Sequence, residues 1–270
     1  MTTAGQVDYF SGQHLFGDDF NRDQIRDWFR DEENAYLELY AQNPNYEYGY
    51  EPLNVRHGFR HLPADRHFGT VLGLGSAYGD ELRPLADRIG RLVIVESADS
   101  YQKKPALDVP TEWRKATVEG NLELQDASVD LTACFGVLHH IPNVTHVLRE
   151  LGRITKPGGF ALIREPVVSM GDWTHDRPGL TRHERGIPRD ILRKQVRDAG
   201  FVIDREALCF FSGTSVIGRL IKHGVYDKKA WVIFDELASK VFAFNYRYHP
   251  QGVWQKVRPT CVFLVLHRDA

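Results

Sequence analysis

Hydrophobic residues between Thr70 and His267 fall into short runs that alternate with segments of helical periodicity. Strands alternating with helices predict an α/β domain, with a parallel sheet that is covered on both faces and that binds ligands at the carboxyl ends of its strands. The apolar runs predict strands at Thr70–Leu74, Leu92–Glu96, Lys115–Val118, Val129–Phe135, Gly159–Arg164, Val202–Phe211 and Thr260–His267. Helices are expected at Asp80–Arg88, Val144–Ile154 and Arg189–Ala199.

Two further segments flank this pattern. Residues 1–67 are polar and aromatic, and within them Asn21–Gln42 has the spacing of a helix, so we expect an N-terminal helical lid before a domain spanning 68–270. Residues 212–258 form an insertion before the last strand, in which Trp231, Phe234, Leu237 and Val241 share one helix face. This insertion is interpreted as a helix on the sheet, a cap over the substrate or a homodimer surface.

Composition narrows the classes of function. The 270 residues carry 34 Lys+Arg and 36 Asp+Glu, a net charge of -2, which argues against a protein that grips nucleic acid by its phosphates. The three cysteines, Cys134, Cys209 and Cys261, lie in separate apolar runs and read as buried thiols rather than disulfides or zinc ligands. No apolar stretch approaches the roughly 20 residues of a membrane span. We therefore expect a cytoplasmic protein.

The most informative stretch is a glycine turn directly after the first predicted strand. Gly73, Gly75 and Gly79 follow the apolar run and precede a helix, so the backbone can turn tightly and approach a ligand closely. Glu96 ends the next strand 21 residues after Gly75. A carboxylate at that position can accept hydrogen bonds from both hydroxyls of a ribose. An adenosine-containing ligand is therefore favoured.

Later stretches add a family resemblance. Leu138-His139-His140-Ile141-Pro142 follows the fourth predicted strand, and Lys156-Pro157-Gly158-Gly159 precedes the fifth. Together with the glycine turn and Glu96, these stretches resemble the class I S-adenosylmethionine-dependent methyltransferases over about residues 68–165. The resemblance implies a Rossmann-like, seven-stranded sheet and S-adenosylmethionine as cofactor. It implies cofactor contacts from Gly73, Leu74, Gly75, Gly79, Glu96, Ser97, Asn121, Leu122 and Phe135.

The chain also departs from the family pattern. Gly73 stands where the family usually has an acidic residue, and Ala77 replaces the middle glycine. Glu81 or a lid residue is the candidate to replace the missing carboxylate. Glu119 and Asn121 are the alternatives for a contact to the adenine amino group.

The resemblance places two histidines beside the cofactor's methyl group. An alcohol acceptor needs a base, and imidazole titrates near neutral pH. His140 is favoured over His139, because it stands where resembling sugar methyltransferases carry a base; the alternative is a histidine that only caps the turn. Glu165, at the end of the fifth predicted strand, would orient the histidine, bind an acceptor hydroxyl or help hold a metal, or else pair with Arg164.

The acceptor is predicted from the polar residues around this core. Asp172, Trp173, His175 and Arg182 lie in a polar, glycine-punctuated loop, and Tyr48 lies in the lid. Such residues suit a hydroxyl-rich acceptor, which favours O-methylation of a sugar, glycan or glycosylated small molecule. N-methylation of an amino sugar or other amine is one alternative, and an inactive S-adenosylmethionine-binding partner subunit is another. The spacing of the acidic residues and histidines leaves the use of Mg²⁺ open.

Overall fold

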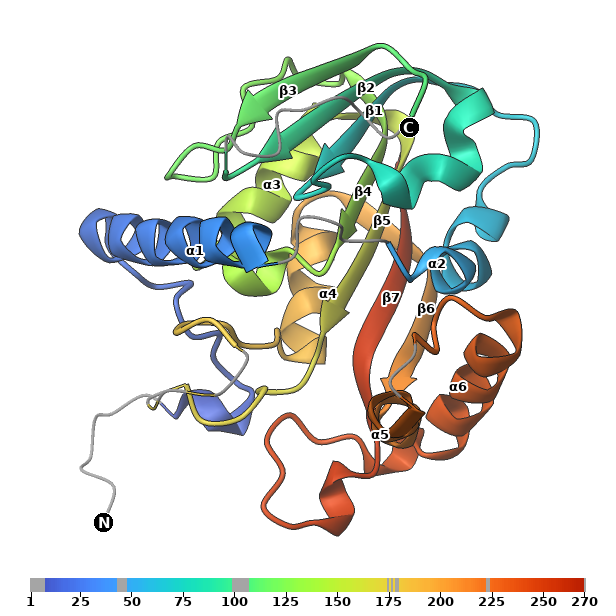
Figure 1. Ribbon diagram of the computed structural model, residues 1–270. Helices are drawn as coiled ribbons and strands as arrows, with labels where there is room; N and C mark the ends of the chain where they lie inside the picture. Colours follow the sequence, from blue (N-terminus) through green and yellow to red (C-terminus); the bar gives the residue numbers. More distant parts are fainter. Residues whose placement is uncertain are drawn as a thin grey trace.

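The computed structural model describes residues 8–42, 48–98, 107–173, 175, 177, 180–221 and 224–269. Seven strands form one sheet in the order β3-β2-β1-β4-β5-β7-β6 (Figure 1). They are β1 (Phe68–Leu74), β2 (Ile89–Glu96), β3 (Thr111–Lys115), β4 (Val129–Phe135), β5 (Thr155–Pro166), β6 (Phe201–Phe211) and β7 (Pro259–Arg268). This Rossmann-like α/β sheet confirms the predicted fold class.

One strand of the sheet, β7, runs against the direction of the others. Strands β1 to β5 are mutually parallel, so their carboxyl ends share one edge. Strand β7 is antiparallel to both β5 and β6, so β6 runs in the same direction as β1 to β5 and the expectation of a parallel sheet was wrong for β7 alone. The insertion 212–258 connects β6 to β7 as a return between adjacent antiparallel strands, which needs no crossover helix.

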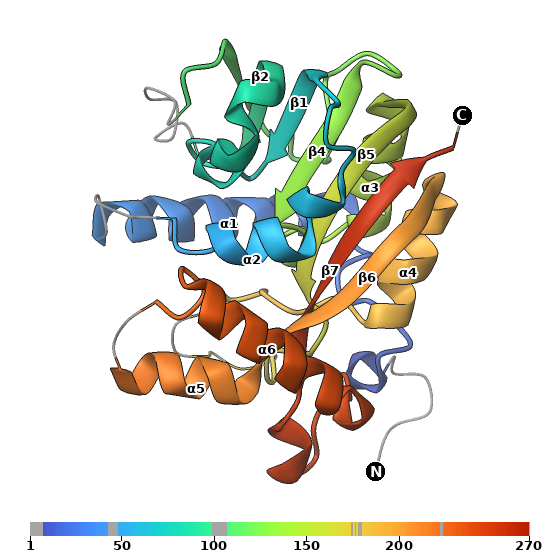
Figure 2. The same cartoon turned by 90° about the vertical axis from the view of Figure 1, so that its right-hand side faces the viewer.

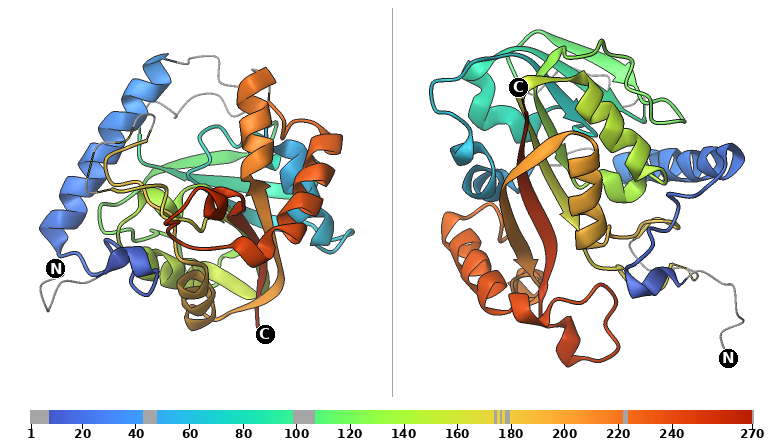
Figure 3. Two further views of the ribbon diagram at one scale, coloured as in Figure 1. Left: turned by 90° about the horizontal axis from the view of Figure 1, so that it is seen from below. Right: turned by 180° about the vertical axis from the view of Figure 1, so that it is seen from behind.

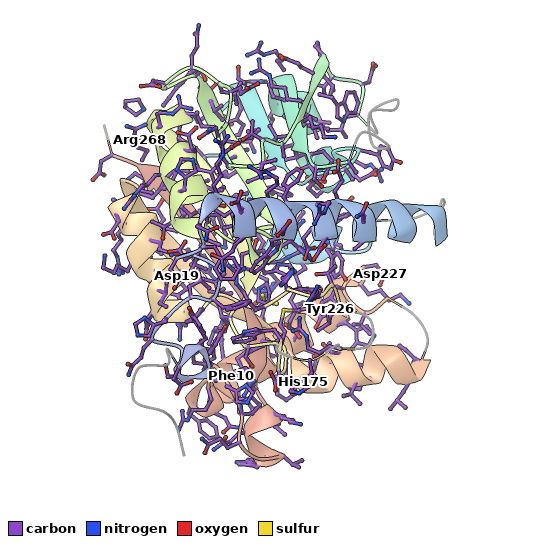
Figure 4. All side chains as sticks on the ribbon, turned by 90° about the vertical axis from the view of Figure 1, so that its left-hand side faces the viewer. Phe10, Asp19, His175, Tyr226, Asp227 and Arg268 are labelled. Atoms are coloured by element: carbon purple, nitrogen blue, oxygen red, sulfur yellow. The ribbon has the colours of Figure 1, made fainter. Side chains whose placement is uncertain are left out.

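Six α-helices surround the described sheet: α1 (Arg22–Gln42), α2 (Glu51–His57), α3 (Val144–Ile154), α4 (Arg189–Asp198), α5 (Ser212–Ile221) and α6 (Lys229–Val241). Helices α3 and α4 cover one face of the sheet, as seen from behind in Figure 3, while α2 and α6 lie on the other side. Helix α1 runs across the carboxyl-end edge of β1, β2 and β4, where Phe29 and Glu32 join residues from those strand ends (Figure 4).

Strand alternation produces two hydrophobic cores. Leu72 and Val93 belong to the core beneath α3 and α4, whereas Val71 and Leu92 belong to the core on the α2 side. Successive side chains of a strand point to opposite faces. All four side chains are fully buried, so β1 and β2 are central strands whose apolar runs were readable from the sequence.

Several boundaries differ from the prediction. Strand β3 covers Thr111–Lys115 rather than Lys115–Val118, because it is a half-buried edge strand of polar composition, and the apolar residues after it line a pocket. The predicted helix at Asp80–Arg88 is present with those bounds as a 3₁₀ helix (η3), and Pro84 within it cannot donate a backbone hydrogen bond. Helices α2 and α5 had no counterpart in the prediction, while α1, α3, α4 and α6 lie where helical periodicity was found.

The remaining short turns are 3₁₀ helices: η1 (Tyr9–Ser11), η2 (Phe59–His61), η5 (Leu138–His140), η6 (Ala243–Asn245) and η7 (Trp254–Lys256). Among the described residues, no helix has both the length and the apolar character needed to cross a bilayer.

Candidate functional site

A pocket opens at the carboxyl ends of β1, β2 and β4, beneath α1. Six of the predicted cofactor residues line it: Leu74, Gly75, Glu96, Ser97, Asn121 and Leu122. His140 lines the same pocket, and α1 contributes Phe29 and Glu32. The tertiary structure therefore brings the glycine turn, the acidic strand tip and one of the two histidines to one cavity.

Backbone geometry explains the glycine turn. Gly75 has a φ of +62°, and a Cβ on it would lie 2.5 Å from a methyl carbon of Val137, so this position accepts only glycine. Ala77 has a φ of +48°, in the left-handed region where the family more often has glycine. Its amide donates to Oε2 of Glu96 at 3.0 Å, and this bond holds Ala77 in that conformation.

Glu96 is well placed to recognise a diol. Its second oxygen, Oε1, accepts a hydrogen bond from the amide of Ser97 at 3.0 Å, so two backbone amides fix the carboxylate. Burial raises the pKa of Glu96, although the amides of Ala77 and Ser97 oppose this shift. An ionised carboxylate has only acceptor sites, and those beyond the two amides suit ribose hydroxyls. The hydrogen-bond acceptors of Glu96 thus fit the ribose hydroxyls in the adenosine part of S-adenosylmethionine.

The far wall of the pocket is apolar. Val95, Val118, Leu122, Ile141 and Val147 are among the residues that line it, a surface suited to a flat aromatic base. The sequence offers Glu119 and Asn121 as alternatives for a contact to the adenine amino group. Of these, Asn121 lines the pocket, with its side-chain oxygen 2.8 Å from Nε2 of His146. Glu119 instead pairs with Arg22 at 2.6 Å.

The remaining predicted cofactor residues lie behind the pocket wall. A Cβ on Gly73 would lie 2.5 Å from the hydroxyl of Ser76, so the Ser76 side chain fills the space that an acidic side chain would need. Gly79 packs against Leu92. The ring of Phe135 packs against Phe263, 5.4 Å away between ring centroids. These three residues are outside the pocket lining, and contact with a cofactor stays a prediction for them.

His139 is buried between two carboxylates. Its Nδ1 lies 2.8 Å from Glu165, and its Nε2 lies 3.4 Å from Glu184. Burial lowers the pKa of His139, but the hydrogen bonds to Glu165 and Glu184 outweigh that effect and raise it to about 9. The ring is therefore cationic at neutral pH, which suits a structural ion pair better than a base.

Glu165 also organises the turn after β4. It accepts hydrogen bonds from the amides of Val137 at 2.8 Å and Leu138 at 2.9 Å, and its side chain is fully buried. Burial raises the pKa of Glu165, but the bond from His139 and these amides outweigh it and lower the pKa below its ordinary value. Glu165 does not form the alternative ion pair with Arg164, because the Arg164 guanidinium donates to Asn54 at 2.8 Å.

His140 faces a carboxylate from α1. Its Nδ1 lies 3.0 Å from Oε2 of Glu32 on α1, and the other oxygen of Glu32 accepts a hydrogen bond from the Thr181 hydroxyl at 2.6 Å. Burial lowers the pKa of His140, and cationic His139 beside it acts in the same direction. Because an ionised carboxylate only accepts, Nδ1 donates to Glu32 and the neutral ring carries its lone pair on Nε2.

Arg185 fixes the backbone that carries both histidines. Its buried guanidinium donates to the carbonyl oxygens of His139 at 3.0 Å, Ile141 at 2.9 Å and Phe16 at 2.9 Å. The indole of Trp28 donates to the carbonyl of His140 at 2.7 Å. The histidine turn is thus held from both α1 and the segment 180–188. Sequence inspection gave no signal for Arg185, since its partners are backbone atoms.

One group of side chains in the described part of the chain has metal-ligand composition. Donor atoms of His139, His140 and Glu184 lie within 4.8 Å of one another. Each already has a protein partner: Glu165 for His139, Glu32 for His140 and the amide of Thr181 for Glu184. The cluster is therefore satisfied as a hydrogen-bonded network. Glu165, Asp172 and His175, whose spacing in the sequence leaves Mg²⁺ open, are not members of this cluster.

None of the predicted acceptor residues lines the pocket as described. Asp172 and His175 pair with each other at 3.1 Å, and Arg182 is exposed, 4.0 Å from Asp31. Trp173 is buried in an aromatic cluster with Phe10, whose ring centroid is 4.3 Å away. Figure 4 labels Phe10 and His175 in the region below α1.

Tyr48 lies in another polar group. Its hydroxyl accepts a hydrogen bond from Asn54 at 2.6 Å, and burial raises its pKa to about 12. Binding of the acceptor stays a prediction for all five residues: Tyr48, Asp172, Trp173, His175 and Arg182.

Comparison with known proteins places this geometry in context. Residues 72–163 match the family described as "Methyltransferase domain". A protein of Mycolicibacterium smegmatis, described as a probable S-adenosylmethionine-dependent methyltransferase, is 27% identical over 156 residues. The match covers 56% of this chain and 58% of that protein, so the chain spans little more than half the length of this curated relative.

Solved structures share the fold at low identity. An S-adenosylmethionine-dependent methyltransferase from Mesorhizobium loti is 15% identical with a TM-score of 0.52, over 77% of this chain and 94% of that one. The [4+2]-cyclase SpnF is 16% identical with a TM-score of 0.57, over 96% of this chain and 99% of that one. A cyclase among these structures shows that this architecture does not by itself specify the reaction.

Proposed function

We propose that this chain, whose residues 72–163 match the methyltransferase-domain family, is an S-adenosylmethionine-dependent methyltransferase that methylates a hydroxyl group on a sugar, a glycan or a glycosylated small molecule. The observation that carries the proposal is the convergence of the glycine turn, Glu96 and His140 on one pocket. When bound there, S-adenosylmethionine supplies an electrophilic methyl group. The protein must hold an acceptor oxygen in line with that methyl and exclude water.

Residues in different parts of the site have different roles in the proposed reaction. Glu96 and the backbone of the glycine turn bind the nucleoside part of the cofactor, against the apolar wall that includes Val95 and Leu122. His140 takes the acceptor proton on Nε2, while Glu32 holds its Nδ1 and stabilises the imidazolium that forms. His139 and Glu165 are positioning residues, because their ion pair fixes the turn that carries His140. Residues 1–67 act as a lid.

A methyl-transfer assay tests this function. The full chain is incubated with S-adenosylmethionine labelled on the methyl group and a panel of sugars, glycosides and amino sugars, and mass spectrometry locates the methyl. The expected product carries it on oxygen. His140→Ala should lower kcat by about 10²–10⁴-fold, because a positioned base contributes that much, while affinity for S-adenosylhomocysteine stays nearly unchanged.

The alternatives give different results in the same assay. An N-methyltransferase would modify the amino sugars on nitrogen, and His140→Ala would change its turnover little, because a neutral amine needs no base. An inactive partner subunit would bind S-adenosylhomocysteine and modify no acceptor. A cytoplasmic location and a homodimer are not needed for the proposed reaction, and both remain proposals from the sequence.

A further inference from the structure

The helical hairpin between β6 and β7 exposes an unusual concentration of apolar side chains. In the described part of the chain, eleven large hydrophobic side chains are exposed, and all but Val202 lie within residues 212–258. Scattered exposed hydrophobic residues are ordinary on a protein surface, whereas a concentrated group marks an interaction site. Helices α5 and α6 lie side by side at one end of the molecule (Figure 2).

The exposed side chains have a helical arrangement. Ile233, Phe234, Leu237 and Val241 project from α6, within an arc of roughly 100° at 3.6 residues per turn. The opposite side of α6 is buried through Val232, Asp235 and Ser239. Burial of that inner side leaves the outer apolar arc without a role in the core of this chain.

Neighbouring elements carry further exposed apolar side chains. Val216, Leu220 and Ile221 are exposed on α5. Beyond α6, Phe244 is 70% exposed and Trp254 is 63% exposed, and both rings pack on Phe242, with centroid distances of 6.3 and 6.4 Å. We call the exposed apolar residues of 212–258 together the hairpin face.

The segment that carries the hairpin face is also basic. Residues 212–258 contain eight Lys and Arg against three Asp and Glu, a formal charge of +5, although the whole chain carries -2. Two of the three acidic residues, Asp235 and Glu236, are buried. Lys228, Lys229 and Lys256 are exposed, and Lys240, also exposed, pairs with Glu236 at 2.6 Å.

We propose that the hairpin face binds the surface of an anionic lipid bilayer. An amphipathic helix with aromatic and aliphatic residues on one face and lysines beside them lies in the membrane interface, with its apolar face below the headgroups. Each lysine near an anionic surface adds attraction. A second copy of this chain is a poorer occupant, because a two-fold contact would place one +5 segment against another.

Vesicle flotation with the full chain tests the proposal. Vesicles of phosphatidylcholine alone are compared with vesicles of equal parts phosphatidylcholine and phosphatidylglycerol. The chain should float with the anionic vesicles and not with the neutral ones. Binding should weaken as salt rises from about 0.1 M to about 0.5 M, because the Debye length shortens.

Two pairs of variants separate the apolar and charged contributions. Phe234→Ser with Leu237→Ser should lower binding at least tenfold, whereas Val202→Ser, an exposed apolar position on β6, should not. Lys228→Glu with Lys229→Glu should lower binding by on the order of twentyfold or more, whereas Arg197→Glu on α4 should change it little. Thermal unfolding confirms that each variant is folded.

Three results would overturn the proposal. The first is no flotation with anionic vesicles at low salt. The second is an equal loss of binding in the control and hairpin variants. The third is a concentration-dependent dimer in sedimentation velocity that Phe234→Ser with Leu237→Ser abolishes, without vesicle binding, which would assign the hairpin face to a second copy. Binding of S-adenosylhomocysteine is measured in parallel and is independent of all three.

Discussion

Glu32 on α1 and His140 after β4 are joined by a hydrogen bond of 3.0 Å between Oε2 and Nδ1, across 108 positions of sequence. The Glu32 side chain is buried, the His140 side chain is 15% exposed, and both line the pocket. Helix α1 therefore completes the environment of the proposed base. Because Thr181 holds the other oxygen of Glu32 at 2.6 Å, the carboxylate has little freedom to turn away.

Replacing Glu32 tests whether its hydrogen bond to His140 supports the proposed base. Glu32→Gln should lower kcat about tenfold or more, because the amide can donate to Nδ1 and so favour the wrong tautomer of His140. The acidic limb of the kcat–pH profile should shift at the same time, which a purely structural defect would not cause. Asp31→Asn is the matched control, since it disturbs the neighbouring pair with His183 at 3.1 Å and leaves His140 untouched. Equal kinetic effects of the two variants would remove Glu32 from the mechanism.

Glu96 should determine cofactor affinity. Glu96→Ala removes the carboxylate that two ribose hydroxyls would use, and charge-assisted hydrogen bonds contribute roughly 1.5–3 kcal/mol each. Titration calorimetry with S-adenosylhomocysteine should show Kd rising by at least about a hundredfold, since two such bonds are lost. Glu119→Gln alters an acidic residue that pairs with Arg22 and lies outside the pocket lining, so its Kd should match the unaltered chain. Unchanged affinity in Glu96→Ala would place the ribose elsewhere.

The buried ion pair of His139 predicts a dependence of stability on pH. The pKa of His139 is raised from 6.5 to about 9 in the folded protein, so folding favours its protonated form. The stabilisation is complete below pH 6.5 and is lost as pH rises through 9, with the free energy of unfolding falling by on the order of 3 kcal/mol. Denaturant unfolding from pH 6 to 9.5 measures this slope.

Variants assign that slope to one histidine. His139→Gln should flatten it, because the side chain no longer gains or loses a proton. His267→Gln changes a histidine that is paired with Asp204 near the sheet edge and should leave the slope in place. A slope that persists in His139→Gln would mean that another group titrates on unfolding.

Arg185 should matter more for stability than for binding. Arg185→Ala leaves several buried carbonyl oxygens of the 138–142 turn without a donor, which predicts a loss of at least about 3 kcal/mol in the free energy of unfolding. Arg182→Ala, three positions away and 73% exposed, should cost little. Chemical denaturation of both variants gives the comparison, and similar stabilities would refute the assigned role.

Local sequence determined the central strands, the glycine turn and most of the long helices. Strand alternation and tight turns depend on residues only a few positions apart. Val71 and Leu72 are consecutive residues of one strand, so their side chains enter opposite cores. Edge strand β3 escaped this reasoning because its polar residues are only half-buried. Helices α2 and α5 were also missed.

Only the tertiary structure decided the partners of the two histidines. Glu184 and Glu165 meet His139, and Glu32 meets His140, from three separate elements. Their hydrogen bonds depend on how distant segments pack, and a one-dimensional pattern carries no signal for such contacts. These contacts also make the pKa values of the two histidines differ. The pKa of His139 is raised in its ion pair and that of neighbouring His140 is lowered, although the two residues are adjacent and of one type in the sequence.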